Sequence, residues 1–272
     1  MKIALLFSGQ IRDINPRLFN AGLKTLINGT NADAYLTYWD QAGISGCHNI
    51  ENLFAPKLKG FDVQNYLRTA FDGINVVSER RLKEEKWEQE LPSQYVEIYK
   101  SPEFSKLTIN SLPQLYQIYE SARTAVNLQN YDYVFRCRFD SVFVSKIGPE
   151  LNRNKPEKIY TINFGKAFCP QRVYDIFFYC KPNQIKVFTD PWENLVEFVN
   201  SDFNNGLDRR DACRILYLAC QKNHFQVETT PIRYCDVYRG SPKYFFDIVK
   251  WGVSREFDIR RCFDVLKMLR YI

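Results

Sequence analysis

The most constraining feature of this sequence is the run Tyr131–Ser141, YDYVFRCRFDS, which places charged residues at every second position. Successive side chains of a β-strand point to opposite faces of the sheet. The two alternating sets are Arg136, Arg138 and Asp140 on one face and Phe135, Cys137 and Phe139 on the other. The run is therefore expected to be a strand with one charged and one apolar face.

Charged side chains are rarely buried without a partner, whereas the residues before Arg136 are typical of an interior strand. In open α/β sheets, ligands bind outside the carboxyl ends of the strands. Two arginines beside one aspartate at such a strand end predict a site for an anionic ligand. The alternative interpretation is a structural ion pair between Arg136 and Asp140.

The amino-terminal half predicts alternating strands and helices. Lys2–Phe7 is a short apolar run of the kind seen in parallel strands covered on both faces, and Ser8–Gln10 reads as the following turn. Further elements are a helix opened by Asn15-Pro16 and running to about Ile27, a strand at Asp33–Trp39 and a strand near Ile74–Val77. This order favours an α/β fold that begins with a βαβ unit.

The rest of the chain continues this pattern with no clean domain boundary, so we expect a single domain. Residues 79–90 are dense in charge and suggest a solvated helix or excursion. The later elements are expected to be a helix from Ser111 to Val126, a strand at Val173–Cys180 interrupted by Asp175, a helix at Asn183–Phe198 containing Pro191, a helix at Asp208–Lys222 and a strand at Phe225–Glu228.

Composition excludes several classes of function. A net charge of +6 from 37 basic and 31 acidic residues is too mild for a nucleic-acid footprint. Eight cysteines without a C-x-x-C motif, together with two histidines, argue against zinc sites, disulfide frameworks and histidine-based mechanisms. Free thiols and a short amino-terminal apolar run predict a cytoplasmic protein without a signal peptide or spanning helix.

Five pieces of the chain, in this order, resemble a family of nucleotide-sugar-dependent glycosyltransferases of GT-A-like fold, found in bacterial lipopolysaccharide and capsule synthesis and in large DNA viruses. The pieces are Ser8-Gly9-Gln10 with Arg12, ADAYLTYWD ending at Asp40, YDYVFRCRFD, the strand with Asp175, and the helix with Asp211. The resemblance implies a Rossmann-type, mostly parallel sheet flanked by helices. It also implies that residues 1–145 bind a UDP- or GDP-linked sugar and that residues 146–272 shape the site of a glycan acceptor.

Such a donor carries a diphosphate leaving group, whose developing charge the enzyme must offset. The resemblance assigns donor binding to Ser8, Gly9, Gln10, Arg12, Asp40, Arg136, Arg138 and Asp140. A small-residue turn lets backbone amides approach phosphates, and the following helix adds a favourable dipole. The alternative is a plain strand-to-helix turn in which Gly9 adopts a special backbone angle.

Many GT-A enzymes hold a divalent cation with an Asp-x-Asp pair, but this chain has Arg138-Phe139-Asp140 in that place. Asp140 alone would hold Mn²⁺ or Mg²⁺ only loosely. An arginine could replace much of the charge of the cation through phosphate contacts. Metal dependence therefore stays open.

Asp175 and Asp211 are the candidates for a catalytic base. A carboxylate within an apolar strand is costly unless it is used or paired, so Asp175 has a functional and a structural interpretation. Asp211 lies at a helix start, where acidic residues cap N–H groups. The family's spacing from an acidic residue to a leucine seven positions later, here Leu218, keeps Asp211 as a candidate base.

Two rival functions stay open, a sulfotransferase-like enzyme and a catalytically inactive glycan-binding module. The carboxyl-terminal segment Asp258–Ile272 has the pattern of a basic amphipathic helix. Such a helix either contacts an anionic membrane or docks on its own domain. Docking is our expectation, and the sequence makes no prediction of oligomeric state.

Overall fold

The structure is a computed structural model. It describes residues 1–12, 14–42, 60–83, 87, 89, 91–95, 111–152, 158–162, 171–203, 212–232 and 234–236. Asp211, the predicted helix start at Asp208 and the segment Asp258–Ile272 lie outside the described residues, so their predicted roles are not tested.

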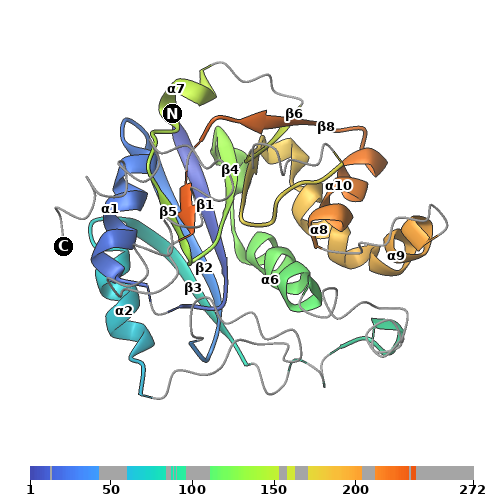
Figure 1. The fold of residues 1–272 in the computed structure, drawn as a ribbon, viewed down its shortest axis with the longest axis horizontal. Coiled ribbons are helices and arrows are strands. Elements are labelled where there is room, and N and C mark those ends of the chain that lie inside the picture. The colour runs from blue at the N-terminus through green and yellow to red at the C-terminus, as the bar shows by residue number, and fades with distance from the viewer. Residues whose placement is uncertain are drawn as a thin grey trace, which may run out of the picture.

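The described elements alternate between strands and helices (Figure 1). In chain order they are β1 (Lys2–Gly9), α1 (Pro16–Ile27), β2 (Asn31–Trp39), α2 (Val63–Ala70), β3 (Asn75–Leu82), α6 (Ser111–Thr124), η1 (Leu128–Asn130), β4 (Tyr133–Cys137), β5 (Ser141–Phe143), α7 (Gly148–Leu151), β6 (Lys158–Ile162), β7 (Phe177–Cys180), η3 (Pro182–Gln184), α8 (Lys186–Glu193), α9 (Leu195–Phe203), α10 (Ala212–Lys222), β8 (Gln226–Thr230) and β9 (Tyr234–Asp236).

Among the described residues, the main sheet has seven strands in the order β3-β2-β1-β4-β7-β6-β8. Strands β1 to β4 pair in parallel, β7 is antiparallel to both of its neighbours, and β6 and β8 pair in parallel. The predicted mostly parallel α/β sheet is therefore confirmed, with β4 at its centre. A separate antiparallel pair joins β5 to β9.

Helices cover both faces of this sheet. Helices α1 and α2 lie on one side, and α6, α8 and α10 lie on the other (Figure 1). Alternate residues of the central strands enter the two cores, with Phe7 and Phe135 on the α1 side and Leu6 and Val134 on the α6 side. No helix among the described residues is both long enough and apolar enough to span a lipid bilayer.

Helix α1 begins where the sequence predicts. Asn15 is its N-cap, and the side-chain oxygen of Asn15 accepts hydrogen bonds from the backbone N–H groups of Arg17 and Leu18. Pro16 occupies the first helical position, where a missing N–H costs nothing. The apolar face predicted for this helix is buried.

Gly22 on that face marks a close approach between α1 and β5. A Cβ atom at Gly22 would lie 2.7 Å from Val142 Cγ1 and 2.9 Å from the backbone nitrogen of Phe143. Contacts this short do not occur, so only glycine fits. Because β5 follows directly on Asp140, this contact fixes the backbone just beyond the candidate site.

Three predictions for the amino-terminal half need correction. Strand β1 runs through Gly9, because Ser8 and Gly9 pair with β2, so the predicted turn starts at Gln10. Strand β3 runs to Leu82, so the first part of the charged stretch 79–90 is an edge strand rather than a solvated helix. Helix α2, capped by Asp62, lies between β2 and β3, where no helix is predicted from the sequence.

Two predictions for the later half also need correction. The strand expected at Val173–Cys180 contains only Phe177–Cys180, and Asp175 lies in the turn before it. The helix expected at Asn183–Phe198 is divided at Asn194, whose N–H donates to Asp190 O and whose backbone leaves the helical region. Pro191 lies inside α8, and its missing N–H affects the carbonyl four residues earlier, so the break at Asn194 is not explained by the proline.

Candidate functional site

The predicted site residues gather at one edge of the sheet, where the central parallel strands end. In the strand register Gly9 pairs with Tyr38, and Phe7 pairs with Cys137. The residues that follow β1, β2 and β4 therefore emerge at the same edge. Cys137 also pairs with Phe177, the first residue of the antiparallel β7, which brings Asp175 to this edge.

Arg138 is held between two carboxylates there. Its Nε donates to Asp140 Oδ1 at 2.8 Å, and its Nη2 donates to Asp140 Oδ2. Its Nη1 lies 3.6 Å from Asp175 Oδ2. All three side chains are partly or largely buried, and we call them the Arg138 cluster (Arg138, Asp140 and Asp175).

Asp140 is a carboxylate in this setting. Burial alone would raise its pKa, but the charge and hydrogen bonds of Arg138, followed by the charges of Arg12 and Arg136, outweigh burial and lower the pKa below its usual value. The structure thus brings Arg12, Arg136, Arg138 and Asp140 into one electrostatic cluster.

Arg136 has a different environment from that predicted. Strand β4 ends at Cys137, so strand alternation does not continue through Arg138 and Asp140, which lie in the following irregular segment and turn. Arg136 is fully buried, and its Nη1 donates to Ser8 O at 2.6 Å and to Cys137 O. Burial lowers its pKa to about 10, and the charge of Asp175 opposes this shift.

Two further predictions concern the run Tyr131–Ser141. The alternative interpretation, an ion pair between Arg136 and Asp140, is wrong, because Asp140 pairs with Arg138 instead. The apolar set is confirmed, since Phe135, Cys137 and Phe139 all lie in the core on the α1 side.

Several buried polar atoms near this edge have no hydrogen-bond partner among the described residues. Ser8 and Thr37 are 0% and 1% exposed and face each other in the strand register. The unpartnered atoms are Ser8 Oγ, Thr37 Oγ1, Gln10 Nε2, Arg136 Nε, Ser141 Oγ and Asp175 Oδ2. Buried polar groups are nearly always satisfied, so this concentration indicates a place where a ligand or water completes the hydrogen bonds.

Gly9 and the start of α1 form the segment predicted to bind phosphate. Gly9 has φ of 142°, a conformation that favours glycine and fits both interpretations of this residue. The N–H groups of Arg17 and Leu18 already donate to Asn15. Helix α1 therefore offers an anion its dipole rather than these two N–H groups.

Cys213 extends the Arg138 cluster towards α10. Its thiol donates to Asp175 Oδ1 at 3.3 Å, and its carbonyl accepts from the N–H of Val173 at 3.0 Å. These contacts place the start of α10 beside Asp175. Cys213, Thr37 and Ser141 were not predicted, and the one signal in the sequence was a polar threonine inside the apolar strand YLTYW.

The Arg138 cluster fits a tightly bound metal poorly. Both carboxylate oxygens of Asp140 accept hydrogen bonds from Arg138, so a cation would have to displace the guanidinium. Within the described part of the chain, no group of three or more His, Cys, Asp or Glu side chains is placed to hold a metal ion. Asp40 lies at the same edge, where its N–H donates to Leu82 O at 2.8 Å.

Comparison with known proteins gives a likeness to solved structures only. No protein-family model and no curated protein sequence matches the chain. The chain is similar to the glycosyltransferase GlyE of Streptococcus pneumoniae TIGR4, at 12% identity and a TM-score of 0.43 over 94% of this chain. It is similar to mouse xyloside xylosyltransferase 1, at 7% identity and a TM-score of 0.47 over 85% of each chain. The chain spans 51% of the length of GlyE.

Proposed function

We propose that this protein is a glycosyltransferase that moves a sugar from a UDP- or GDP-linked donor to a hydroxyl of a glycan acceptor. The observation that carries the proposal is the Arg138 cluster, set among unpartnered buried polar atoms at the carboxyl ends of the central parallel strands. Ligands of open α/β sheets bind at this edge. Residues 1–145 supply most of the donor site in this proposal, and residues 146–272 supply the acceptor side.

The chemistry requires positive charge that is already oriented when the bond to the diphosphate breaks. Asp140 and Asp175 hold the guanidinium of Arg138 from two directions, which fixes its plane. Arg12 adds charge close to Asp140. We assign leaving-group stabilisation to Arg138 and Arg12, and a supporting role to Arg136 through the carbonyl group of Ser8.

The acceptor hydroxyl has to lose a proton, and a carboxylate can accept it. Asp175 Oδ2 accepts no hydrogen bond from the described residues, and Asp211 lies two positions before Cys213, whose thiol donates to Asp175. We propose one of these two aspartates as the base. Substituting each separately by Asn and measuring transfer to the acceptor distinguishes them.

We further propose that any divalent cation is held loosely and that the arginines supply much of the charge it would otherwise provide. The measurement is transfer activity against free Mn²⁺ or Mg²⁺ after exhaustive chelation. Part of the activity should survive chelation. Complete loss that the metal restores would contradict this proposal.

A thermal-shift screen against nucleotide-sugars tests the function itself. A ligand present at 100 times its Kd stabilises the native state by about 2.7 kcal/mol, which at this chain length raises the midpoint by roughly 5–10 °C. Release of UDP or GDP in the presence of a glycan then shows transfer. A shift with a sulfate donor instead would support the sulfotransferase alternative, and glycan binding without turnover would support an inactive binding module.

A further inference from the structure

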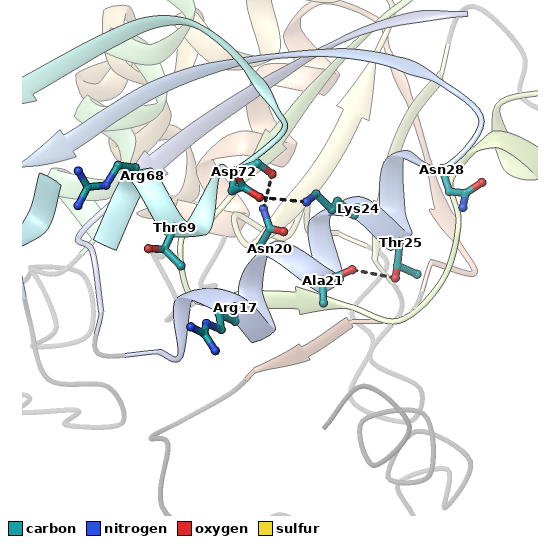
Figure 2. A pocket seen from close by; sticks show the side chains of 9 residues that line it. All are labelled: Arg17, Asn20, Ala21, Lys24, Thr25, Asn28, Arg68, Thr69 and Asp72. Carbon is teal, nitrogen blue, oxygen red and sulfur yellow. Dashed lines mark hydrogen bonds and ion pairs between the residues drawn. The ribbon is translucent and has the colours of Figure 1, made fainter. Parts of the chain in front are cut away.

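A polar groove lies on the outer side of α1 and α2, away from the core-facing side of these helices. It encloses about 720 Å³ and is lined by residues of both helices and of the turn after α2 (Figure 2). We call it the α1–α2 groove and define it by Arg17, Ala21, Lys24, Arg68, Thr69 and Asp72. Its volume falls within the range of about 300–1,000 Å³ that small-molecule sites have.

The α1–α2 groove is positively charged. Lys24 Nζ lies 3.5 Å from Asp72 Oδ2, so the one carboxylate among the described lining residues is already offset. Arg68 donates to a neutral group, Asn65 Oδ1, and Arg17 has no carboxylate partner among the described residues. The charge of the two arginines is therefore left over, and this excess complements an anion.

The rest of the lining offers hydrogen-bond acceptors to a ligand that carries hydroxyl groups. The hydroxyls of Thr25 and Thr69 donate to the helix carbonyls of Ala21 and Asn65, which leaves their oxygens as acceptors. Small-molecule sites are mostly apolar and aromatic, whereas Ala21 is the one apolar residue among the described residues of this lining. Peptides and bilayers need apolar anchor sites or faces, and the described lining residues include no large apolar side chain.

The position of the α1–α2 groove connects it to the candidate site. Arg17 lies in the first turn of α1, a few residues after the Gly9–Arg12 segment at the carboxyl edge of the sheet. Lys24 lies seven residues further on, about 10.5 Å along the helix axis. A linear ligand along α1 from Arg17 to the ion pair of Lys24 with Asp72 would thus begin near the donor site and extend over about two sugar rings.

We propose that the α1–α2 groove binds an anionic oligosaccharide, the carboxylate-, sulfate- or phosphate-bearing part of the acceptor glycan. The identification of this ligand as the acceptor rests on the proposed function. The binding of an anionic glycan to the groove does not.

The probe is a hexamer of α-1,4-linked galacturonic acid, titrated into the full-length protein and followed by calorimetry. Its methyl ester, which has the same sugars without the charges, is the ligand control. Arg17→Glu should weaken binding by about threefold to tenfold, because one exposed attraction becomes a repulsion. Lys186→Glu is the matched protein control, since Lys186 is also exposed in the first turn of a helix, α8.

A second variant tests the shape of the α1–α2 groove rather than its charge. Ala21→Trp fills the floor and should abolish binding with little change in net charge, and a melting curve confirms that the variant folds. Three results would each overturn the proposal. Arg17→Glu could bind the hexamer as tightly as wild type does, the methyl ester could bind as tightly as the acid, or Ala21→Trp could leave binding unchanged. Tighter binding of hexaglutamate or of phosphatidylserine vesicles, weakened by Arg17→Glu, would also overturn it by assigning the groove to a peptide or a membrane.

The donor thermal shift separates this proposal from the proposed function. Arg17→Glu should leave the shift with nucleotide-sugars unchanged. A protein that binds the hexamer but no nucleotide-sugar would keep the groove proposal and lose the proposed enzyme activity.

Discussion

The two ends of the central sheet differ in whether their buried polar groups have hydrogen-bond partners. At the amino end, Asp33 accepts hydrogen bonds from Asn75 at 2.6 Å and from Tyr131 at 2.7 Å, and Lys2 lies 3.4 Å away. The Tyr131 hydroxyl also lies 2.8 Å from that of Tyr35. We call these residues the amino-end network (Lys2, Asp33, Tyr35, Asn75 and Tyr131).

At the carboxyl end, beside the paired Arg138 cluster, Ser8, Thr37 and Arg136 each bury a polar atom that has no hydrogen-bond partner among the described residues. A satisfied network holds a fold together, whereas an unsatisfied one lowers stability until something binds. Burial of polar groups by itself therefore does not mark a functional site. The difference between satisfied and unsatisfied groups does, and it points to the carboxyl end.

The largest expected difference between the two ends is in turnover, and substituting one aspartate at each end tests it. Asp140→Asn or Arg138→Ala should lower turnover by about 10²- to 10³-fold, because oriented charge is lost, while the fold stays intact. Asp33→Asn should leave turnover near the wild-type value. Steady-state kinetics with a circular dichroism spectrum of each variant make the test, and near-native turnover of well-folded Asp140→Asn would remove the Arg138 cluster from the site.

The amino-end network should contribute more to the free energy of unfolding than the polar groups at the carboxyl end. Tyr131→Phe removes a hydroxyl that bonds both Asp33 and Tyr35, which should cost about 1–2 kcal/mol. At this size the melting midpoint would fall by roughly 2–8 °C. Calorimetry against wild type gives the value, and a midpoint unchanged by Tyr131→Phe would show that the network is not a stabilising one.

A smaller effect of opposite sign is expected from Thr37→Val. The hydroxyl of Thr37 is buried without a hydrogen-bond partner among the described residues, and valine keeps the branched shape favoured in strands. Urea unfolding should show a gain of up to about 1 kcal/mol. A loss of stability instead would mean that the hydroxyl is satisfied and that the two ends differ less than we infer.

The smallest effect is the pH dependence of the amino-end network. Burial would raise the pKa of Asp33, but hydrogen bonds from Asn75, Tyr131 and Lys2 outweigh it and lower the pKa. A lowered pKa contributes stability above the unfolded value of about 3.9, and that stability is lost as the pH falls through the folded value. The stability difference between wild type and Asp33→Asn should stay constant from pH 7 to pH 5 and shrink below about pH 4.

Local sequence information is sufficient to predict where β1 and α1 begin. The apolar run Lys2–Phe7 and the Asn15-Pro16 cap predict β1 and α1 because an apolar run and a cap act within a few residues. The charged end of β3 could not be predicted, since Glu79 bonds Tyr38 and Gln64, and Arg80 pairs with Glu120 at 2.5 Å. These partners are distant in sequence, and without them the charges look solvated.

The candidate site was predicted in its residue types but not in its geometry. The spacing of Arg138 and Asp140 indicated a charged strand end, yet their pairing depends on the segment after β4, which strand alternation does not describe. Arg136 appeared equivalent to Arg138 in the sequence, and only the fold shows that it is buried against Ser8 O. Unsatisfied groups such as Thr37 Oγ1 are invisible in a sequence, because satisfaction is a property of the packed structure.

The close approach at Gly22 has a consequence for how this chain can evolve. Glycine inside a helix costs roughly 0.5–1 kcal/mol relative to alanine, so drift alone would remove it. Alanine would place its Cβ 2.7 Å from Val142 and 2.9 Å from the backbone of Phe143, and shortening the side chain at 142 would relieve only the first of these contacts. Divergent descendants of this protein should therefore keep glycine at position 22 long after the surface of α1 has changed, which makes this one residue a marker for recognising them.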